Sequence, residues 1–220
     1  MKIFATSDLH GNRAIIDKLR YMEDDCDLIL ICGDIGGKNY RTNSFREFSL
    51  RQREDVDYLA GILSGISTPA RFILGNDDWL EYESEYYFDR TFELPPYRFI
   101  PFEHVLITPF NTNREANENK IRYELEKLTV GADTIIVAHT PPAFCGDECY
   151  DGRRVGSDSV HSWVEENQPR VWLCGHIHED NSAHKIGETR VFNCACDYFK
   201  NILKGWMIDL ETRDYESVSI

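Results

Sequence analysis

The sequence predicts an α/β sandwich with helices on the outside. Two observations support this prediction. Short apolar runs rich in Ile, Val, Leu and Phe recur along the chain, and each is bounded by Gly, Asp or Pro. Stretches with the apolar spacing of a helix alternate with these runs. Strands that alternate with helices are typical of α/β folds, in which the helices cover the buried strands.

The apolar runs predict buried strands, since their apolar residues are continuous rather than alternating with polar ones. The clearest runs cover residues 3–6, 28–32, 72–74, 135–138 and 171–174. Weaker candidates cover residues 105–107, 190–192 and 206–210. We therefore expect five buried strands and up to three more.

Helical spacing of apolar residues predicts the elements between the strands. They are expected at about 13–22, at about 44–64 as one long helix or a broken one, at about 114–129, and after a cap at Ser157 or Asp158. Segments 33–44, 75–103 and 140–157 are expected to be long loops, which in compact domains are usually functional. No segment resembles a linker, so we expect residues 1–220 to form a single domain.

Composition excludes several classes of protein. The chain has 24 basic and 38 acidic residues, a formal charge of −14, and no clustered Lys/Arg run, so we expect no binding to duplex nucleic acid. No apolar run approaches the roughly 18 residues of a membrane span, and Asp8 comes too early for a secretory signal peptide. A cytoplasmic protein with no membrane partner is therefore expected.

The seven cysteines do not predict a disulfide framework, because their number is odd and no export signal precedes them. Four of them offer an alternative, a structural zinc site: Cys145, Cys149, Cys194 and Cys196. Their spacing differs from the usual pair of C-x2-C knuckles, so this alternative is the weaker interpretation.

Residues that can bind metal follow five of the predicted strands. These segments are Ser7-Asp8-Leu9-His10-Gly11, Gly33-Asp34, Gly75-Asn76-Asp77-Asp78, His139, and Gly175-His176-Ile177-His178. In open α/β sheets, ligand sites gather outside the carboxyl ends of the strands. We therefore expect side chains that are far apart in the sequence to converge in space.

The candidate ligands combine carboxylates, imidazoles and one amide. They are Asp8, His10, Asp34, Asn76, His139, His176 and His178. Oxygen and nitrogen donors without thiolates suit Mn, Fe, Zn, Co or Ni, and seven donors are too many for one ion with an open position. Two ions that share a carboxylate would use them all and could clamp a phosphoryl group. We expect two divalent ions, with manganese first among these metals.

The ordered motifs D-x-H-G, G-D, G-N-x-D, an isolated His and G-H-x-H resemble those of the calcineurin-like metallophosphoesterase superfamily. The resemblance spans residues 8–178. Segments 139–142, 155–157 and 175–179 look like those of its small, single-domain phosphodiesterase-like members. The resemblance implies a four-layer α-β-β-α sandwich and a phosphoesterase that acts on a small or nucleotide-like phosphate ester.

The resemblance also implies a role for each ligand. Asp8, His10, Asp34 and His178 would hold the first ion, and Asn76, His139 and His176 the second, with Asp34 as the bridge. A hydroxide between the ions would attack phosphorus in line.

The sequence departs from the family pattern at one catalytic position. Many members have a histidine where this chain has Asp77, followed by an acid, here Asp78. An ionised aspartate repels phosphate and cannot replace a positive charge, and general acid help is worth roughly 10²–10⁴-fold. We therefore expect a phosphodiesterase with little monoesterase activity. Asp77 and Asp78 remain the candidate catalytic residues, and Asp77→His is expected not to lower activity.

Each motif also has a plainer interpretation. Asp8 and Asp34 could be turn or helix-capping residues, and His139 a hydrogen-bonded core histidine. The aromatic stretch 79–88 is read as a packed amphipathic helix in preference to a wall for a nucleobase or aryl group. His104, His161 and His184 match no motif.

The basic residues nearest in sequence to the loops are candidates for the substrate phosphate. They are Arg13, Arg41, Arg46, Arg153 and Arg154. Two other functions compete with catalysis. One is a non-catalytic or weakly catalytic scaffold or binding module on the same fold, which the complete ligand set disfavours. The other is a DNA nuclease, which the charge and the missing basic stripe disfavour.

Overall fold

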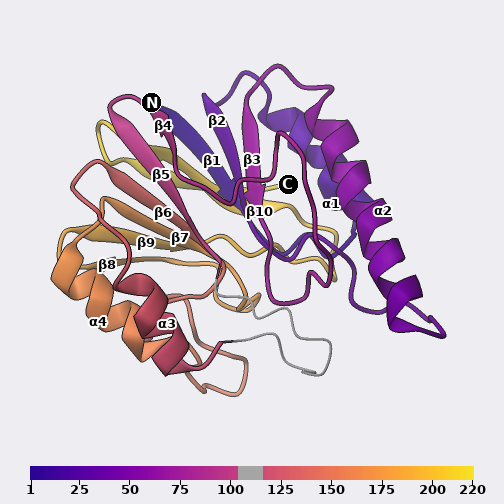
Figure 1. Ribbon diagram of the computed structural model, residues 1–220. Coiled ribbons are helices and arrows are strands. Elements are labelled where there is room, and N and C mark those ends of the chain that lie inside the picture. The colour runs from indigo at the N-terminus through magenta and orange to yellow at the C-terminus, as the bar shows by residue number, and fades with distance from the viewer. Residues whose placement is uncertain (104–115) are drawn as a thin grey trace.

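The structure, a computed structural model that describes residues 1–103 and 116–220, has two β-sheets packed face to face between layers of helix (Figure 1). The first sheet has the order β11 (Tyr215–Ser219), β10 (Lys204–Asp209), β1 (Lys2–Thr6), β2 (Leu28–Cys32) and β3 (Ala70–Ile73). The second has the order β4 (Phe92–Leu94), β5 (Tyr97–Phe102), β6 (Thr134–Ala138), β7 (Val171–Cys174), β9 (Thr189–Asn193) and β8 (Ala183–Ile186). The predicted four-layer α/β sandwich is confirmed.

Helices cover the outer face of each sheet (Figure 1). On the first sheet lie α1 (Arg13–Ile16), a 3-10 helix over Asp17–Met22, and α2 (Phe45–Leu63). On the second sheet lie α3 (Glu118–Leu125) and α4 (Asp158–Asn167). Each of these described α-helices begins at a capping side chain that accepts a backbone N–H of the first turn, as expected for Asn and Ser at this position.

Strand β2 shows why the central strands are apolar throughout. Leu28 and Leu30 face the layer between the two sheets, whereas Ile29 and Ile31 face α1 and α2. Successive side chains of a strand point to opposite faces, so a strand that is covered on both sides needs apolar residues at every position.

The central strands of both sheets run parallel. Parallel pairing joins β1, β2 and β3 in the first sheet and β5, β6, β7 and β9 in the second. The outer strands β4, β8, β10 and β11 pair antiparallel. Within each sheet, the carboxyl ends of the parallel strands therefore lie along one edge, and this arrangement positions the candidate site.

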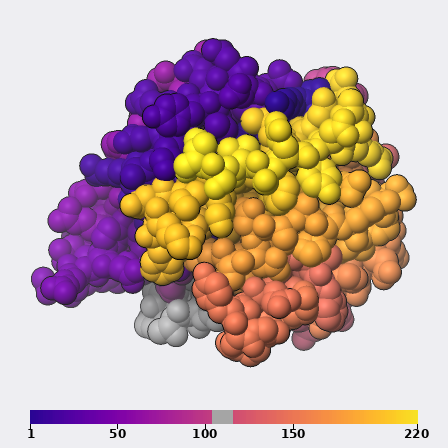
Figure 2. Space-filling view, turned by 180° about the vertical axis from the view of Figure 1, so that it is seen from behind, coloured from indigo at the N-terminus to yellow at the C-terminus, as the bar shows by residue number. Residues whose placement is uncertain are grey.

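The C-terminal hairpin completes the first sheet beside β1. Figure 2 shows this segment in yellow, lying between the indigo N-terminal segments and the orange segments of the second sheet. Among the described helices, none combines the length and the hydrophobicity that a membrane crossing requires.

Several predicted elements differ from those observed. The predicted helix at 13–22 is one α-helical turn followed by a 3-10 helix, whose buried Leu19 and Met22 are three residues apart, a spacing that suits three residues per turn. The described part of segment 114–129 is helical only over Glu118–Leu125, because the Asn117 side chain caps the helix there. The long helix over Phe45–Leu63 is continuous.

The aromatic stretch 79–88 is not a helix. The Ser84 hydroxyl accepts the N–H groups of Tyr86 and Tyr87, and the segment then runs along the free edge of β3. There the Phe72 N–H donates to the Tyr86 carbonyl at 2.8 Å, and the Phe88 N–H donates to the Phe72 carbonyl at 3.1 Å. Edge pairing thus replaces the predicted helix.

Four described strands were not predicted: β4, β5, β8 and β11. β4 and β5 lie inside the segment 75–103, which was predicted to be a loop. The strand candidate at 105–107 and His104 lie outside the described residues.

Candidate metal centre

Loops that follow five parallel strands bring the seven predicted ligands to one edge of the sandwich. Asp8 and His10 follow β1, Asp34 follows β2, Asn76 follows β3, His139 follows β6, and His176 and His178 follow β7. Strand ends of one sheet thus meet those of the other, because the parallel strands of both sheets point toward this edge.

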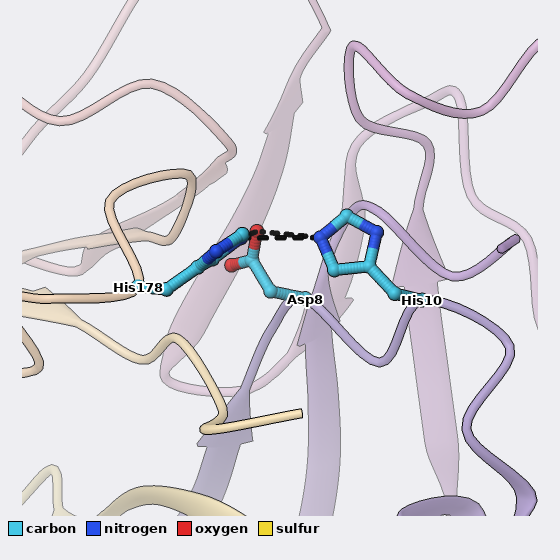
Figure 3. A group of neighbouring side chains, drawn as sticks. All are labelled: Asp8, His10 and His178. Atoms are coloured by element: carbon cyan, nitrogen blue, oxygen red, sulfur yellow. Dashed lines mark hydrogen bonds and ion pairs between the residues drawn. The ribbon is translucent and has the colours of Figure 1, made fainter. Parts of the chain in front are cut away.

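The first group of side chains comprises Asp8, His10 and His178, with one ligand atom of each within 4.8 Å of the others (Figure 3). His178 Nε2 lies 2.9 Å from Asp8 Oδ1 and 3.1 Å from His10 Nε2. The second group comprises Asp34, His139 and His176, again within 4.8 Å. His139 Nε2 lies 3.3 Å from Asp34 Oδ2.

Two contacts join the groups and extend them. His10 Nε2 of the first group lies 3.9 Å from Asp34 Oδ2 of the second, so Asp34 lies between the two. His176 Nδ1 lies 2.9 Å from Asn76 Oδ1, which adds the amide to the second group. The plain interpretation of Asp8 and Asp34 as isolated turn residues does not account for this convergence.

The backbone at the centre is strained. Asp8, His10, Asp34 and His176 have φ values of 62°, 46°, 54° and 73°. Such left-handed conformations cost on the order of 1–3 kcal/mol each for residues other than glycine and cluster at functional sites. The fold therefore holds these side chains in place against a local energetic cost.

Two glycines leave room for the carboxylates. A Cβ atom on Gly75 would lie 2.2 Å from Asp34 Oδ1, and one on Gly175 would lie 2.4 Å from Asp8 Oδ2. Since real Cβ contacts are essentially never this close, each carboxylate packs directly against a glycine backbone. Packing against the carboxylates thus explains why positions 75 and 175 are glycine.

Charge and burial at the centre oppose each other. Burial disfavours the charge of Asp8, but the neighbouring His178 and His139 outweigh it and hold the pKa of Asp8 well below its usual range. Burial likewise disfavours a charged His139, but the carboxylate of Asp34 outweighs it and raises the pKa of His139 to about 10. Burial lowers the pKa of His10. The carboxylates are therefore ionised and ready to bind a cation.

The hydrogen bonding of His139 fits a metal ligand. Its Nδ1 lies 2.7 Å from the Cys32 carbonyl, which can only accept, so Nδ1 carries the proton. In the neutral ring, Nε2 then has a lone pair for a metal ion, and it lies 3.3 Å from Asp34 Oδ2, which is itself a proposed ligand. A backbone carbonyl that fixes the tautomer of a ligand histidine is a usual feature of metal sites.

The two candidate catalytic residues have different surroundings. Asp77 is 27% exposed at its side chain, and its carboxylate lies within 4.8 Å of ligand atoms of His10 and Asp34. Asp78 is fully buried and accepts the N–H groups of Ile35, Gly36 and Gly75 at 2.7 to 3.1 Å. Burial and the charge of Asp34 raise the pKa of Asp78 to about 7. Asp77 thus lies close to the candidate ligands, whereas Asp78 hydrogen-bonds the backbone of the loops that follow β2 and β3.

Sequence reasoning missed two residues at the centre, Lys38 and Tyr198. Lys38 Nζ lies 3.1 Å from Asp77 Oδ2 and 5.4 Å from the ring centroid of Tyr198. The Tyr198 ring lies 4.5 Å from the His10 ring and 5.0 Å from the His178 ring. Lys38 lies in segment 33–44, which was expected to be functional because it is a long loop. No sequence signal indicated Tyr198.

Three of the candidate arginines already have partners. Arg13 lies over the Tyr58 ring at 4.6 Å, Arg153 pairs with Asp151 at 2.6 Å, and Arg154 pairs with Asp147 at 2.8 Å. Arg41 is exposed on the segment before α2, and Arg46 is exposed in the first turn of α2.

The remaining histidines and cysteines do not join these groups. His161 Nδ1 donates to the Ala143 carbonyl at 2.7 Å, and His184 Nε2 bonds the Ser182 hydroxyl at 2.8 Å. Within the described residues, the side-chain groups close enough to hold an ion contain no cysteine. Burial raises the pKa of Cys196 to about 11, which favours the thiol over the thiolate that zinc binds.

Comparisons with known proteins agree with this architecture. A family model described as calcineurin-like phosphoesterase matches residues 1–180. An uncharacterised protein of Methanocaldococcus jannaschii is 29% identical over 207 residues, which cover 88% of this chain and 87% of that protein.

Two solved structures share the fold. The TT1561 protein of Thermus thermophilus superimposes with a TM-score of 0.65 at 16% identity, over 99% of this chain and 97% of the other. A structure described as that of a novel archaeal phosphodiesterase superimposes with a TM-score of 0.56 at 14% identity, over all of both chains.

Proposed function

Since this chain belongs to the calcineurin-like phosphoesterase family, a family of metal-dependent phosphoric ester hydrolases, we propose that it is a phosphodiesterase that uses two divalent ions. The observation that carries the proposal is the pair of side-chain groups described above, each within 4.8 Å, with Asp34 between them. Two ions about 3.5–4 Å apart would fit neighbouring groups of this kind.

The proposed ligands divide between the two ions. Asp8, His10 and His178 would hold one ion, Asn76, His139 and His176 the other, and Asp34 would bridge them. Oxygen and nitrogen donors of this kind accept manganese, and iron, zinc, nickel and cobalt are the alternatives. When bound, such ions supply an activated water and positive charge for the phosphoryl group.

The protein's own residues would orient these ligands. The Cys32 carbonyl fixes the His139 ring, and the Asp8 carboxylate accepts the His176 N–H at 2.9 Å, which ties the loop after β7 to the loop after β1. Asp78 would act as a positioning residue, because its carboxylate binds the backbone of the loops that carry Asp34 and Asn76.

A diester is favoured over a monoester by charge. A phosphomonoester carries about −1.5 to −2 at neutral pH, whereas a diester carries a single negative charge. The Asp77 carboxylate, 27% exposed beside His10 and Asp34, would repel the second charge. The structure described as that of an archaeal phosphodiesterase shares the fold of this chain.

The experiment compares hydrolysis of bis(p-nitrophenyl) phosphate and p-nitrophenyl phosphate. The protein is first treated with a chelator, and Mn²⁺ is then restored. Asp34→Ala removes the bridge, and Asp25→Ala, a carboxylate on the exposed segment before β2, is the matched control.

We expect activity on the diester that depends on Mn²⁺, is lost in Asp34→Ala and is kept in Asp25→Ala. Faster turnover of the monoester would refute the preference for diesters but would not contradict the proposed metal centre. Tight metal binding without turnover of either ester would favour a binding module instead.

A further inference from the structure

We propose that Lys38 binds the phosphate group of the substrate through its ammonium, held in place by Asp77. The inference rests on the phosphodiesterase function proposed above and names a substrate-binding residue of that site. The centre presents the carboxylates of Asp8, Asp34 and Asp77 to an anionic substrate. A cation of the chain itself at this place would offset part of that repulsion in addition to the metal ions.

Lys38 lies at the centre by several measures. Its Nζ is 3.1 Å from Asp77 Oδ2, and the Asp77 carboxylate belongs to a group with His10 and Asp34 whose ligand atoms lie within 4.8 Å. The Tyr198 ring, which contacts His10, lies 5.4 Å from Nζ.

Two side chains of α2 hydrogen-bond the backbone next to Lys38. The Gly37 N–H donates to Asp55 Oδ2 at 3.0 Å, and Gln52 Nε2 donates to the Gly37 carbonyl at 3.0 Å. The same Gln52 amide also donates to the Asp77 carbonyl, and its Oε1 accepts the Trp79 N–H. One fully buried side chain therefore sets the positions of both partners of the ion pair.

The pair is poorly placed for a purely structural role. The side chains of Lys38 and Asp77 are 32% and 27% exposed, and ion pairs of this kind contribute about 0–1 kcal/mol to stability. Asp77 occupies one of the three donors of the ammonium, and the others remain able to bond a phosphate oxygen. Asp77 then orients Lys38, so that the ammonium can meet one negative charge of a phosphate group while the carboxylate beside it repels a second.

The test measures binding of inorganic phosphate to the Mn²⁺-loaded protein by titration calorimetry. Lys38→Met removes the charge, and Lys38→Arg keeps it. Lys185→Met is the matched control, because Lys185 pairs with Glu188 near the end of β8 away from the centre. Binding of Mn²⁺ alone is measured for each variant, and KM and kcat for bis(p-nitrophenyl) phosphate are measured in parallel.

We expect Lys38→Met to weaken phosphate binding about 10- to 100-fold, as loss of a charged hydrogen bond does. Mn²⁺ affinity should stay within about twofold, KM should rise more than kcat falls, and Lys38→Arg should restore most of the loss. A further variant, Asp77→Asn, removes the carboxylate that orients the ammonium, so it should weaken phosphate binding, but less than Lys38→Met does, because the charge of Lys38 remains.

Two results would overturn the role of Lys38 alone. One is unchanged phosphate affinity in Lys38→Met, and the other is a parallel loss of Mn²⁺ affinity, which would mean that the pair supports the metal ligands. Weak Mn²⁺ binding in Asp77→Asn would show that Asp77 is itself a ligand and would also refute its role in orienting Lys38. If the loaded parent protein hydrolysed bis(p-nitrophenyl) phosphate but did not bind phosphate, this inference alone would be overturned, whereas absence of both activities would overturn the proposed function as well.

Discussion

Substitution of Gly75 by alanine tests the packing of the centre most directly. The added methyl carbon would lie 2.2 Å from Asp34 Oδ1 and 2.5 Å from Asp34 N, and the backbone atom cannot swing away. Either the Asp34 loop or the Gly75 loop must shift. Gly75 also donates its N–H to Asp78 Oδ2 at 2.9 Å, so a shift strains that bond too.

The expected magnitude follows from overpacking of a close-packed interior, which costs about 1–3 kcal/mol. For a domain of this size, each kcal/mol changes Tm by about 2–4 °C, so Tm should fall by about 2–12 °C. A displaced ligand should also lower metal affinity, since misoriented ligands typically cost about 10- to 100-fold.

The assay pairs thermal unfolding in the presence of a chelator with Mn²⁺ titration. Gly61→Ala is the matched control, because a Cβ at this position in α2 meets no atom within 4 Å. In a helix interior alanine is favoured over glycine by roughly 0.5–1 kcal/mol, so Tm of the control should rise. If Gly75→Ala had the same Tm and the same Mn²⁺ affinity as the parent protein, the close contact between Gly75 and Asp34 would not exist in solution.

Two further predictions concern protonation and position 77. In chelated protein, the pKa of His139 is raised to about 10, above the unfolded value of about 6.5. Its stabilising contribution is therefore complete below pH 6.5 and is lost as pH rises toward 10. Tm of the chelated parent should fall across this window, and the fall should be shallower in His139→Gln; parallel curves would contradict the assignment. Asp77→His should keep or raise kcat/KM for bis(p-nitrophenyl) phosphate with Mn²⁺ present, whereas a large drop would show that the loss of the Asp77–Lys38 ion pair outweighs the relief of charge repulsion.

The sequence predicted the buried strands well and the outer ones poorly. Strands such as 28–32 and 135–138 are covered on both faces, so every position is apolar and the run is visible without context. β8 and β11 lie at sheet edges and are partly or largely exposed, so their polar residues hide them. Residues 86–88 of segment 79–88 pair with the edge of β3 through hydrogen bonds to Phe72, which no local pattern reveals.

The convergence of the candidate ligands was predictable because each follows a strand, and the carboxyl ends of parallel strands meet at one edge. Lys38 was not predictable in the same way. Its place depends on Gln52, a residue of α2 that reaches two loops at once, and on an ion pair with Asp77, 39 residues away. Such relations exist only in the folded chain.

The left-handed backbone at Asp8, His10, Asp34 and His176 has a consequence for laboratory evolution. At these positions glycine would relieve local strain, while any useful side chain would be lost. Where the lost side chain contributes less stability than the strained backbone costs, selection for heat resistance alone would therefore favour glycine and remove activity. Stabilisation campaigns on this scaffold need a catalytic screen in every round, since robustness and chemistry compete at the same few positions.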